Sequence, residues 1–261
     1  FDPPDYGTST LGGTVACGLS GPRRPFTGSV RDFVLGIGAI TSSGVYHEFG
    51  GQVMKNVAGY DVARLMTGAF GTLGVLADVS LKVLPKPERE VTLMQEITPD
   101  ELRSRMRELR NSGAPLSGLM ASQNVLYIRL SGTEIGVRAA AADIGGEEVM
   151  GDHWALAATQ RLPALVSAKQ LWRISVSSDN PMHMKDAALV EWGGAVRWLS
   201  DPESIPRLES APSWLFRNEE DGGPLERMPP LPEYVKRLHQ RLKKAFDPIC
   251  IMNPDRMYRG L

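Results

Sequence analysis

The chain has 261 residues, 42% of them hydrophobic, with a formal net charge of −1 at pH 7. This size supports one large core or two modest ones, and the charge gives no electrostatic reason to expect nucleic acid or an anionic membrane as the main partner. Cys17 and Cys250 form no CxxC pair, which excludes a disulfide framework and a cysteine-ligated metal centre within this chain. The longest apolar runs have the length of strands, so we expect no transmembrane segment.

Residues 1–87 are rich in glycine and contain short runs of β-branched residues. These runs predict three strands, with a turn at residues 42–44 between the first two. The third strand ends at Pro85 and Pro87, and because proline cannot donate to a central ladder, we place a domain boundary after residue 87. The predicted strands are residues 30–41, 45–49 and 75–84.

A different pattern covers residues 88–232. Thr98, Pro99 and Glu101 form a capping-box signature, with proline at the first helical position. The order strand, helix, strand, strand, helix is the start of a ferredoxin-like unit. The predicted elements are strands at 91–97, 116–121, 125–130, 172–176, 195–198 and 214–216, helices from Thr98 and over 133–144, and loops at 178–194 and 218–230.

Two predicted helices carry a clear apolar stripe. In the helix that begins at Thr98 the stripe consists of Leu102, Met106 and Leu109. The C-terminal helix, residues 234–246, carries its stripe on Val235, Leu238, Leu242 and Phe246. Its other face is basic, which is typical of a solvated face and also compatible with docking of an acidic partner. The basic residues are Lys236, Arg237, Arg241, Lys243 and Lys244.

Small residues are dense between Thr10 and Gly21, where the sequence reads TLGGTVACGLSG. A helix that starts on glycines presents bare N–H groups to an anion or an electron-rich ring, and its dipole favours negative charge. The segment fits neither G-x-G-x-x-G nor the Walker pattern, so it indicates neither a Rossmann site nor a P-loop. Close packing of a helix on a strand explains the glycines equally well.

A second segment, residues 55–76, reads KNVAGYDVARLMTGAFGTLGVL. It contains a short predicted helix, residues 61–66, that is bracketed by glycines and leads into a strand. Turns at Gly68, Gly71 and Gly74 let the backbone pass close to a flat ligand.

A third segment, FDPICIMNP at residues 246–254, ends the C-terminal helix and returns the chain in an extended form. Together with DFVLG at residues 32–36, the three segments resemble the FAD-binding oxidases of the vanillyl-alcohol-oxidase, or PCMH, type. The resemblance is closest to the family of glycolate oxidase E subunits, in which stretches similar to GLSGPRRP and GGQVMKNVAGYDVARLMTGA occur. It is dense over residues 7–87, sparse over 88–230, and returns over 234–258.

The resemblance implies an α+β protein that combines the C-terminal part of a PCMH-type FAD-binding domain with a ferredoxin-like α+β cap. The expected division is residues 1–87 for the FAD part, 88–232 for the cap, and 233–261 for a helix and tail that return to the FAD part. It implies FAD as the cofactor and leaves the catalytic residues unassigned, and we expect no metal because no metal-binding motif is recognisable. The residues expected to bind FAD are Thr10, Gly12, Gly13 and Ala16 at the pyrophosphate and flavin, Gly74 and Val75 at the adenine, and Asn253 near the flavin edge.

The resemblance also implies an activity, the oxidation of the small 2-hydroxy acid glycolate to glyoxylate within a complex. The implied partners are a second flavoprotein subunit and an iron–sulfur subunit that passes electrons on, and nucleic acid is not among them. We expect a cytoplasmic location, with peripheral association at the inner membrane through the partner subunits. Two alternatives are a non-catalytic assembly subunit that keeps the FAD fold, and a stand-alone flavin oxidoreductase for another alcohol or 2-hydroxy acid.

Two features depart from the family pattern. The chain begins at Phe1 without a start methionine, and the family's N-terminal pyrophosphate loop precedes the region seen here. We therefore expect that residues have been removed ahead of Phe1 and that this chain binds FAD weakly or not at all. Phe70 stands where relatives that act alone on 2-hydroxy acids carry an acidic residue, and their His-rich metal motif is not recognisable, which keeps the assembly-subunit alternative open.

Several charged residues have two interpretations. Lys55 and Arg64 either hold an anion beside the flavin-facing segment or, respectively, cap a turn and pair with a neighbouring acid. Arg23 and Arg24 either steer an acidic substrate or contact a partner subunit, or they belong to a solvated loop. His183, between two methionines, is a candidate soft-metal ligand with no second cluster to join.

The cap contains three tryptophans that form either its core or an exposed subunit interface, and the sequence does not decide between them. Cys17 lies where a small residue packs against a ring, so we expect a structural role for it. The three tryptophans are Trp192, Trp198 and Trp214.

Overall fold

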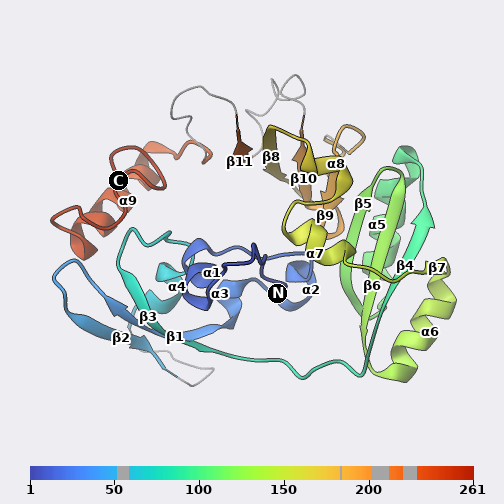
Figure 1. Cartoon of the computed structure of the whole chain (residues 1–261), viewed down its shortest axis with the longest axis horizontal. Coiled ribbons are helices and arrows are strands. Elements are labelled where there is room, and N and C mark those ends of the chain that lie inside the picture. The colour runs from blue at the N-terminus through green and yellow to red at the C-terminus, as the bar shows by residue number, and fades with distance from the viewer. Residues whose placement is uncertain (52–58, 183, 201–211, 220–227) are drawn as a thin grey trace.

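A computed structural model describes most of the chain, namely residues 1–51, 59–182, 184–200, 212–219 and 228–261. Its strands form two sheets, one of three strands and one of eight (Figure 1). Residues 82–88 run between the two sheets as a long connection that belongs to neither. The fold is α+β, as the sequence predicted. The boundary proposed after residue 87 falls in this connection, and the division into domains stays a proposal.

The smaller sheet has β1 (Val34–Ile40) at its centre, with β2 (Tyr46–Gly50) and β3 (Val75–Leu81) antiparallel on either side. Two short helices, α1 (Leu11–Cys17) and α4 (Val62–Met66), pack against these strands. The helices and strands share one core of aliphatic side chains. Its buried members are Val15, Val30, Val34, Ile37, Ala39, Ala63, Met66, Ala69 and Leu73.

The strand predicted at residues 30–41 is wrong over its first four residues, which form the helical turn α3 (Val30–Phe33). The reason is a capping box, because the N–H and the hydroxyl of Ser29 both donate to Asp32 Oδ2 at 2.8 Å. A second short helix, α2 (Arg24–Thr27), lies where the sequence indicated a loop. The turn and the returning strand are as predicted.

The larger sheet contains the ferredoxin-like unit that the sequence predicted. Its strand order is β5-β6-β4-β7, and every neighbouring pair is antiparallel. Since β6 lies between β4 and β5, those two strands run parallel and are joined by α5, which is the split arrangement of this fold. The elements are β4 (Arg89–Glu96), α5 (Pro99–Asn111), β5 (Leu116–Ser122), β6 (Val125–Gly132), α6 (Glu134–Ile144) and β7 (Glu147–Glu148).

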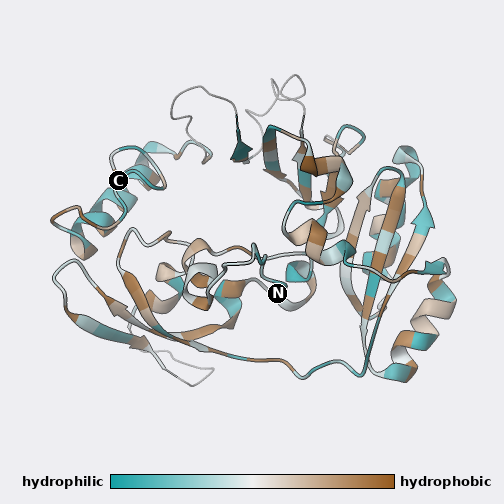
Figure 2. Cartoon of the chain, viewed as in Figure 1, coloured by the Kyte–Doolittle hydropathy of each residue, from teal (hydrophilic) through white to brown (hydrophobic). Residues whose placement is uncertain are grey.

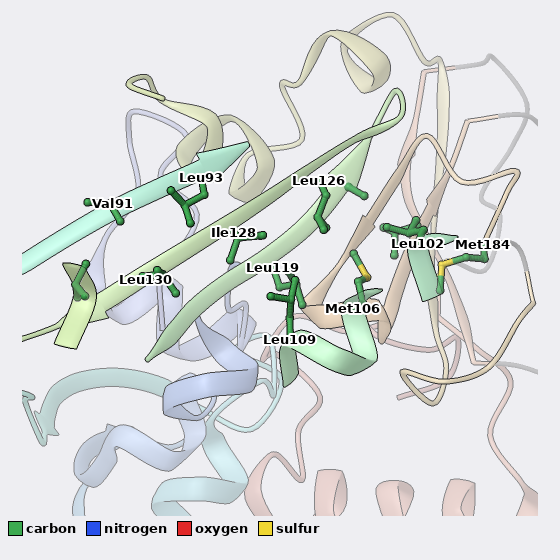
Figure 3. Close-up of a cluster of buried hydrophobic side chains, with 13 residues drawn as sticks. Val91, Leu93, Leu102, Met106, Leu109, Leu119, Leu126, Ile128, Leu130 and Met184 are labelled. Carbon is green, nitrogen blue, oxygen red and sulfur yellow. The ribbon is translucent and has the colours of Figure 1, made fainter. Parts of the chain in front are cut away.

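Helix α5 begins at the predicted capping box and turns its apolar stripe onto the sheet. The three stripe residues are at most 5% exposed, and they pack against side chains of β4, β5 and β6 (Figure 3). Burial of one such side chain stabilises a fold by roughly 1.5–3 kcal/mol, so this layer gives the cap a core of its own. The strand residues are Val91, Leu93, Leu119, Leu126, Ile128 and Leu130.

Four further strands continue the same sheet beyond β5, and going outward from β5 their order is β9-β10-β8-β11. The loop predicted at residues 178–194 is wrong in part, because it contains β9 and the 3-10 turn η1 (Trp192–Gly194). Strand β9 has only three residues, all buried, so its sequence shows no alternation. Of the loop predicted at 218–230, residues 220–227 lie outside the described part. The strands are β8 (Gln170–Ser175), β9 (Leu189–Glu191), β10 (Val196–Leu199) and β11 (Ser213–Asn218).

Three more helices complete the described chain. The sequence did not predict α7 (His153–Ala158) and α8 (Pro163–Val166), which are too short to show a helical period. The C-terminal helix α9 (Glu233–Phe246) is as predicted. Figure 1 shows it near the smaller sheet, although the cap separates the two in the sequence, and Figure 2 shows that most of this helix is coloured as hydrophilic.

Candidate functional site

The three segments that the sequence singled out meet in the structure. The N–H of Gly68 donates to the carbonyl of Val15 at 3.0 Å, and the N–H of Phe70 donates to that of Ala16 at 2.8 Å. The third segment joins them through Asn253, whose Nδ2 donates to the Phe70 carbonyl at 2.8 Å. Parts of the chain separated by about 50 and 180 residues in the sequence therefore form one backbone cluster.

Helix α1 is defined by its two caps. Thr10 is the N-cap, and its Oγ1 accepts the N–H of Gly13 at 3.0 Å. Gly18 ends the helix in the left-handed conformation at φ 65°, and a Cβ there would lie 2.8 Å from the Cα of Gly68. By contrast, a Cβ at Gly12 would have no atom within 4 Å. Close contact with another segment therefore explains why position 18 must be glycine, but no such contact explains the glycine at position 12.

The remaining expected FAD ligands lie around the same cluster. A Cβ at Gly74 would be 2.8 Å from the carbonyl oxygen of Ile40, so this glycine allows close passage of two strands. Val75 begins β3, pairs with Ile40, and has a side chain that is 55% exposed. A Cβ at Gly71 would lie 2.8 Å from Nδ2 of Asn253. Contact of these residues with FAD stays a prediction.

Helix α9 is anchored to this cluster by a lysine that the sequence placed on a solvated face. Lys243 is only 7% exposed, and its Nζ donates to the carbonyls of Thr72 at 2.9 Å and Met252 at 2.5 Å. It also pairs with Asp247 at 2.7 Å. Although burial acts in the opposite direction, the hydrogen bonds from Lys243 and from the N–H groups of Met252 and Ile251 lower the pKa of Asp247 to about 2.

A cavity of about 500 Å³ lies between this cluster and the cap. From the glycine segments it is lined by Cys17, Gly18 and Phe70, and from the cap by Arg173, Trp192 and Trp214. Its size is within the range of about 300–1,000 Å³ that is usual for small-molecule sites. Cys17 therefore faces a cavity, and burial raises the pKa of its thiol.

Two cations share one aromatic ring at this cavity. The guanidinium carbons of Arg24 and Arg173 lie over the indole of Trp192, at 4.4 Å and 4.6 Å from the ring centroid. Arg24 also lines the cavity. We call these three residues the arginine–tryptophan cluster. Arg24 comes from α2, a segment for which the sequence left substrate steering, partner contact and a solvated loop open, and Arg173 comes from β8.

The backbone at Trp192 is held in a conformation that aromatic residues rarely adopt, with φ 55°. The next two residues are glycines at φ 61° and 100°, and their carbonyls accept hydrogen bonds from Arg110 (to Gly193) and Arg197 (to Gly194). Such strain persists only where the surroundings enforce it, and it is concentrated at functional sites. The turn is therefore built to hold the Trp192 indole in place.

Phe70, in the position of the acidic residue of single-acting relatives, also has a positive φ, 53°. Its ring makes an edge contact with Trp214 of the cap at 6.2 Å between centroids. Of the three tryptophans, Trp198 is 2% exposed and belongs to the cap core, whereas Trp192 and Trp214 line the cavity.

The other charged candidates have separate outcomes. Arg64 pairs with Asp61 at 3.4 Å, as one interpretation predicted. Arg23 is not in a solvated loop, since it is 21% exposed and pairs with Asp2 and Glu90. Lys55 and His183 lie outside the described residues.

The described part of the chain shows neither a metal site nor a membrane-spanning helix. Within it, three or more His, Cys, Asp or Glu side chains are nowhere grouped so as to hold a metal ion. Every helix in this part is too short or too polar to cross a bilayer.

Sequence reasoning singled out Arg24 and Trp192 separately, but it missed Arg173 and did not place the three residues together. They belong to three elements, of which α2 is far in the sequence from the other two, and no local motif connects them. The two glycines that follow Trp192 are a weak signal in the sequence for the turn in which this residue has a positive φ.

Comparison with solved structures defines the class of protein. Two crystal structures of alkyldihydroxyacetonephosphate synthase align with 94% of this chain and 58% of their own length, at a TM-score of 0.61 and 15% and 14% identity. This similarity concerns the fold alone, and it agrees with the α+β fold that the sequence predicted. No protein-family profile matches the chain.

Comparison with curated sequences identifies the family. The chain is 47% identical over its whole length to glycolate oxidase subunit GlcE of Escherichia coli (strain K12), and the match spans 75% of that protein. The chain belongs to the glycolate oxidase subunit GlcE family. It is also 39% identical over 97 residues, 36% of its length, to 21% of glycolate oxidase subunit GlcD of Bacillus subtilis (strain 168). A similar match, 36% identity over 94 residues, covers 35% of this chain and 20% of a D-lactate dehydrogenase of Anaerostipes hadrus.

Proposed function

We propose that this chain is the FAD-binding subunit of a glycolate oxidase complex and contributes to the oxidation of glycolate to glyoxylate. The observation that carries the proposal is the joining of three glycine-rich or turn segments beside one cavity, by hydrogen bonds of 2.8–3.0 Å. Membership of the GlcE family supports the same activity. FAD would supply the acceptor for the hydride from the α-carbon of the acid.

The residues present fit such a cofactor. Gly12 leaves open space beside α1 that the described chain does not fill. We propose that Thr10, Gly12, Gly13 and Ala16 lie along the pyrophosphate and flavin. Gly74, Val75 and Asn253 would then complete the site at its adenine and flavin ends. Because the family's N-terminal pyrophosphate loop is expected to supply much of the grip, we propose that this chain by itself binds FAD weakly or not at all.

A matched pair of glycines tests FAD binding in the complete subunit. Gly13 and Gly136 both follow a threonine N-cap by three residues, and a Cβ at either would lie 3.0 Å from that threonine's Oγ1. The structural effect of Gly13→Ala and Gly136→Ala should therefore be similar. We expect only Gly13→Ala to weaken FAD binding, by about tenfold or more, since overpacking by a methyl group costs about 1–3 kcal/mol. Flavin absorbance per chain during titration measures this, and equal FAD affinity in the two variants would contradict the proposed site.

We propose that the subunit acts with a second flavoprotein subunit and an iron–sulfur subunit, in the cytoplasm or at the inner membrane surface through those partners. Co-purification of the tagged subunit, followed by flavin and iron analysis of the complex, tests this assembly. A subunit that stays alone and still reduces a dye with glycolate would contradict it.

The alternative of a non-catalytic assembly subunit is favoured by one observation, the apolar Phe70 at the cavity where single-acting relatives carry an acid. Glycolate-dependent dye reduction by the complete subunit, alone and with its partners, separates the two functions. Any turnover by the isolated subunit rules out the assembly role. Screening other alcohols in the same assay addresses a stand-alone oxidoreductase.

A further inference from the structure

The arginine–tryptophan cluster has the charge of an anion site that is not neutralised within the described chain. Among the described residues, no carboxylate forms an ion pair with Arg24 or Arg173, and Arg173 donates only to Ser175 Oγ, at 2.9 Å. The adjacent Arg23 provides a contrast, because it pairs with both Asp2 and Glu90. The two cations therefore differ from the structural arginines of this protein.

The acids near Arg24 and Arg173 do not neutralise the charges of these two arginines. Asp32 is the acid whose charge acts on the pKa of Arg24, but it already accepts two hydrogen bonds from Ser29. Glu191 faces Arg173, but it is 3% exposed, and burial raises the pKa of its carboxyl to about 7. Arg173 itself has a lowered pKa, first through burial and then through the positive charge of Arg24. An anion bound by both guanidinium groups would relieve that repulsion.

The cluster is also held rigidly. Arg110 and Arg197 fix the carbonyls of Gly193 and Gly194, which sets the position of the Trp192 indole that both cations contact. The indole Nε1 is buried and has no hydrogen-bond partner in the described structure. A buried donor without an acceptor costs stability unless a ligand completes it.

We propose that Arg24, Arg173 and Trp192 bind the carboxylate of a small carboxylic acid in the 500 Å³ cavity. Guanidinium groups match the geometry of a carboxylate through paired N–H donors. The choice of glycolate as that acid rests on the function proposed above. The cluster thereby sets substrate specificity, because it selects 2-hydroxy acids over neutral alcohols of the same size.

Direct binding tests this without turnover. Calorimetric titration of the complete subunit with glycolate, glycolamide and inorganic phosphate compares a carboxylate with its neutral amide and with another anion. We expect glycolate to bind more tightly than either. In Arg24→Gln and Arg173→Gln the Kd for glycolate should rise about 10- to 100-fold, as expected for loss of one charged hydrogen bond, while that for glycolamide stays unchanged.

Controls separate this effect from general damage. Arg138→Gln removes a 66% exposed arginine on α6 and should leave glycolate binding unchanged. Arg173→Lys keeps the positive charge but lacks the paired N–H donors of a guanidinium. It should therefore bind glycolate more tightly than Arg173→Gln and less tightly than the native protein. Arg24 is exposed, so Arg24→Gln should fold normally. If Arg173→Gln fails to fold, the binding measured with Arg24→Gln decides the outcome.

Several results would overturn the inference. These are no detectable glycolate binding, equal affinity for glycolate and glycolamide, tighter binding of phosphate, or an unchanged Kd in Arg24→Gln. Flavin content is measured on the same samples. A subunit that binds glycolate selectively but never FAD would remove the proposed function alone, whereas FAD binding without selection for the carboxylate would remove this inference alone.

Discussion

At the scale of single residues, the dense glycines have different physical roles. Gly18 and Gly68 allow the end of α1 to touch the turn that follows α4, whereas Gly12 borders open space. The sequence predicted that this segment carries a site but left packing as an equal explanation. Only atomic contacts distinguish the two, because every glycine is identical in sequence.

Gly18→Ala tests the packing role. The alanine would need a φ of 65° and would place its Cβ 2.8 Å from the Gly68 Cα. Gly113→Ala is the matched control, because its φ is 74° but no atom lies within 4 Å of its Cβ. We expect Gly113→Ala to cost about 1 kcal/mol of unfolding free energy and Gly18→Ala at least about 1 kcal/mol more. Urea denaturation measures both, and equal losses would contradict the contact.

At the scale of elements, the turn between β9 and β10 is the feature that the sequence concealed. It holds Trp192 at positive φ and follows the buried acid Glu191, whose Oε1 accepts the indole N–H of Trp198 at 2.9 Å. Its other carboxylate oxygen has no partner in the described structure. The turn therefore concentrates strain and an uncompensated acid beside the arginine–tryptophan cluster.

Glu191 makes the stability of the protein depend on pH. Burial raises the pKa of this carboxyl from 4.5 to about 7, so its contribution to stability is complete below pH 4.5 and is lost as pH rises through 7. Glu191→Gln has no such loss. We expect the stability of the variant relative to the native protein to increase by up to about 3 kcal/mol from pH 4.5 to pH 8. Urea unfolding across this range measures the difference, and a flat difference curve would show that Glu191 does not titrate as described.

At the scale of the whole molecule, the N-terminal region and the larger sheet are in contact near the N-terminus as well as at the cavity. Asp2 pairs with Arg23 of the segment before α2, at 3.2 Å, and with Arg129 of β6. Arg129 is 4% exposed and lies over the ring of Trp154. Burial tends to raise the pKa of Asp2, but the charges and hydrogen bonds of Arg129 and Arg23 outweigh it and lower that pKa.

Asp2→Asn should loosen this junction. Removal of the charge leaves the buried Arg129 without a counter-ion, and we expect a loss of roughly 2 kcal/mol at pH 7. The stability that the charged Asp2 adds relative to asparagine is present above the ordinary pKa of aspartate. It should disappear as pH falls through the lowered pKa that Asp2 has in the folded protein. Asp5→Asn, at an exposed position, is the control. Chemical denaturation at pH 7 and pH 3 measures both variants, and an equal loss at the two pH values would contradict the assignment.

The sequence by itself determined the elements with strong local signals. The capping box at Thr98, the stripe on α5, the ferredoxin-like order and the final helix all rest on interactions within a few residues, which the chain order records directly. The short elements α2, α3, α7, α8 and β9 carry too few residues to show a period. Their existence is decided by packing and caps.

Only the tertiary structure decided where the chemistry gathers. Asn253 reaches Phe70, Lys243 reaches Thr72, and Arg24 and Arg173 share Trp192, each across a large distance in the sequence. Such contacts depend on how two sheets and a returning helix are placed, and no local pattern of side chains encodes that placement. The sequence therefore determined which segments are built for close backbone approach, and the fold determined which charges meet beside them.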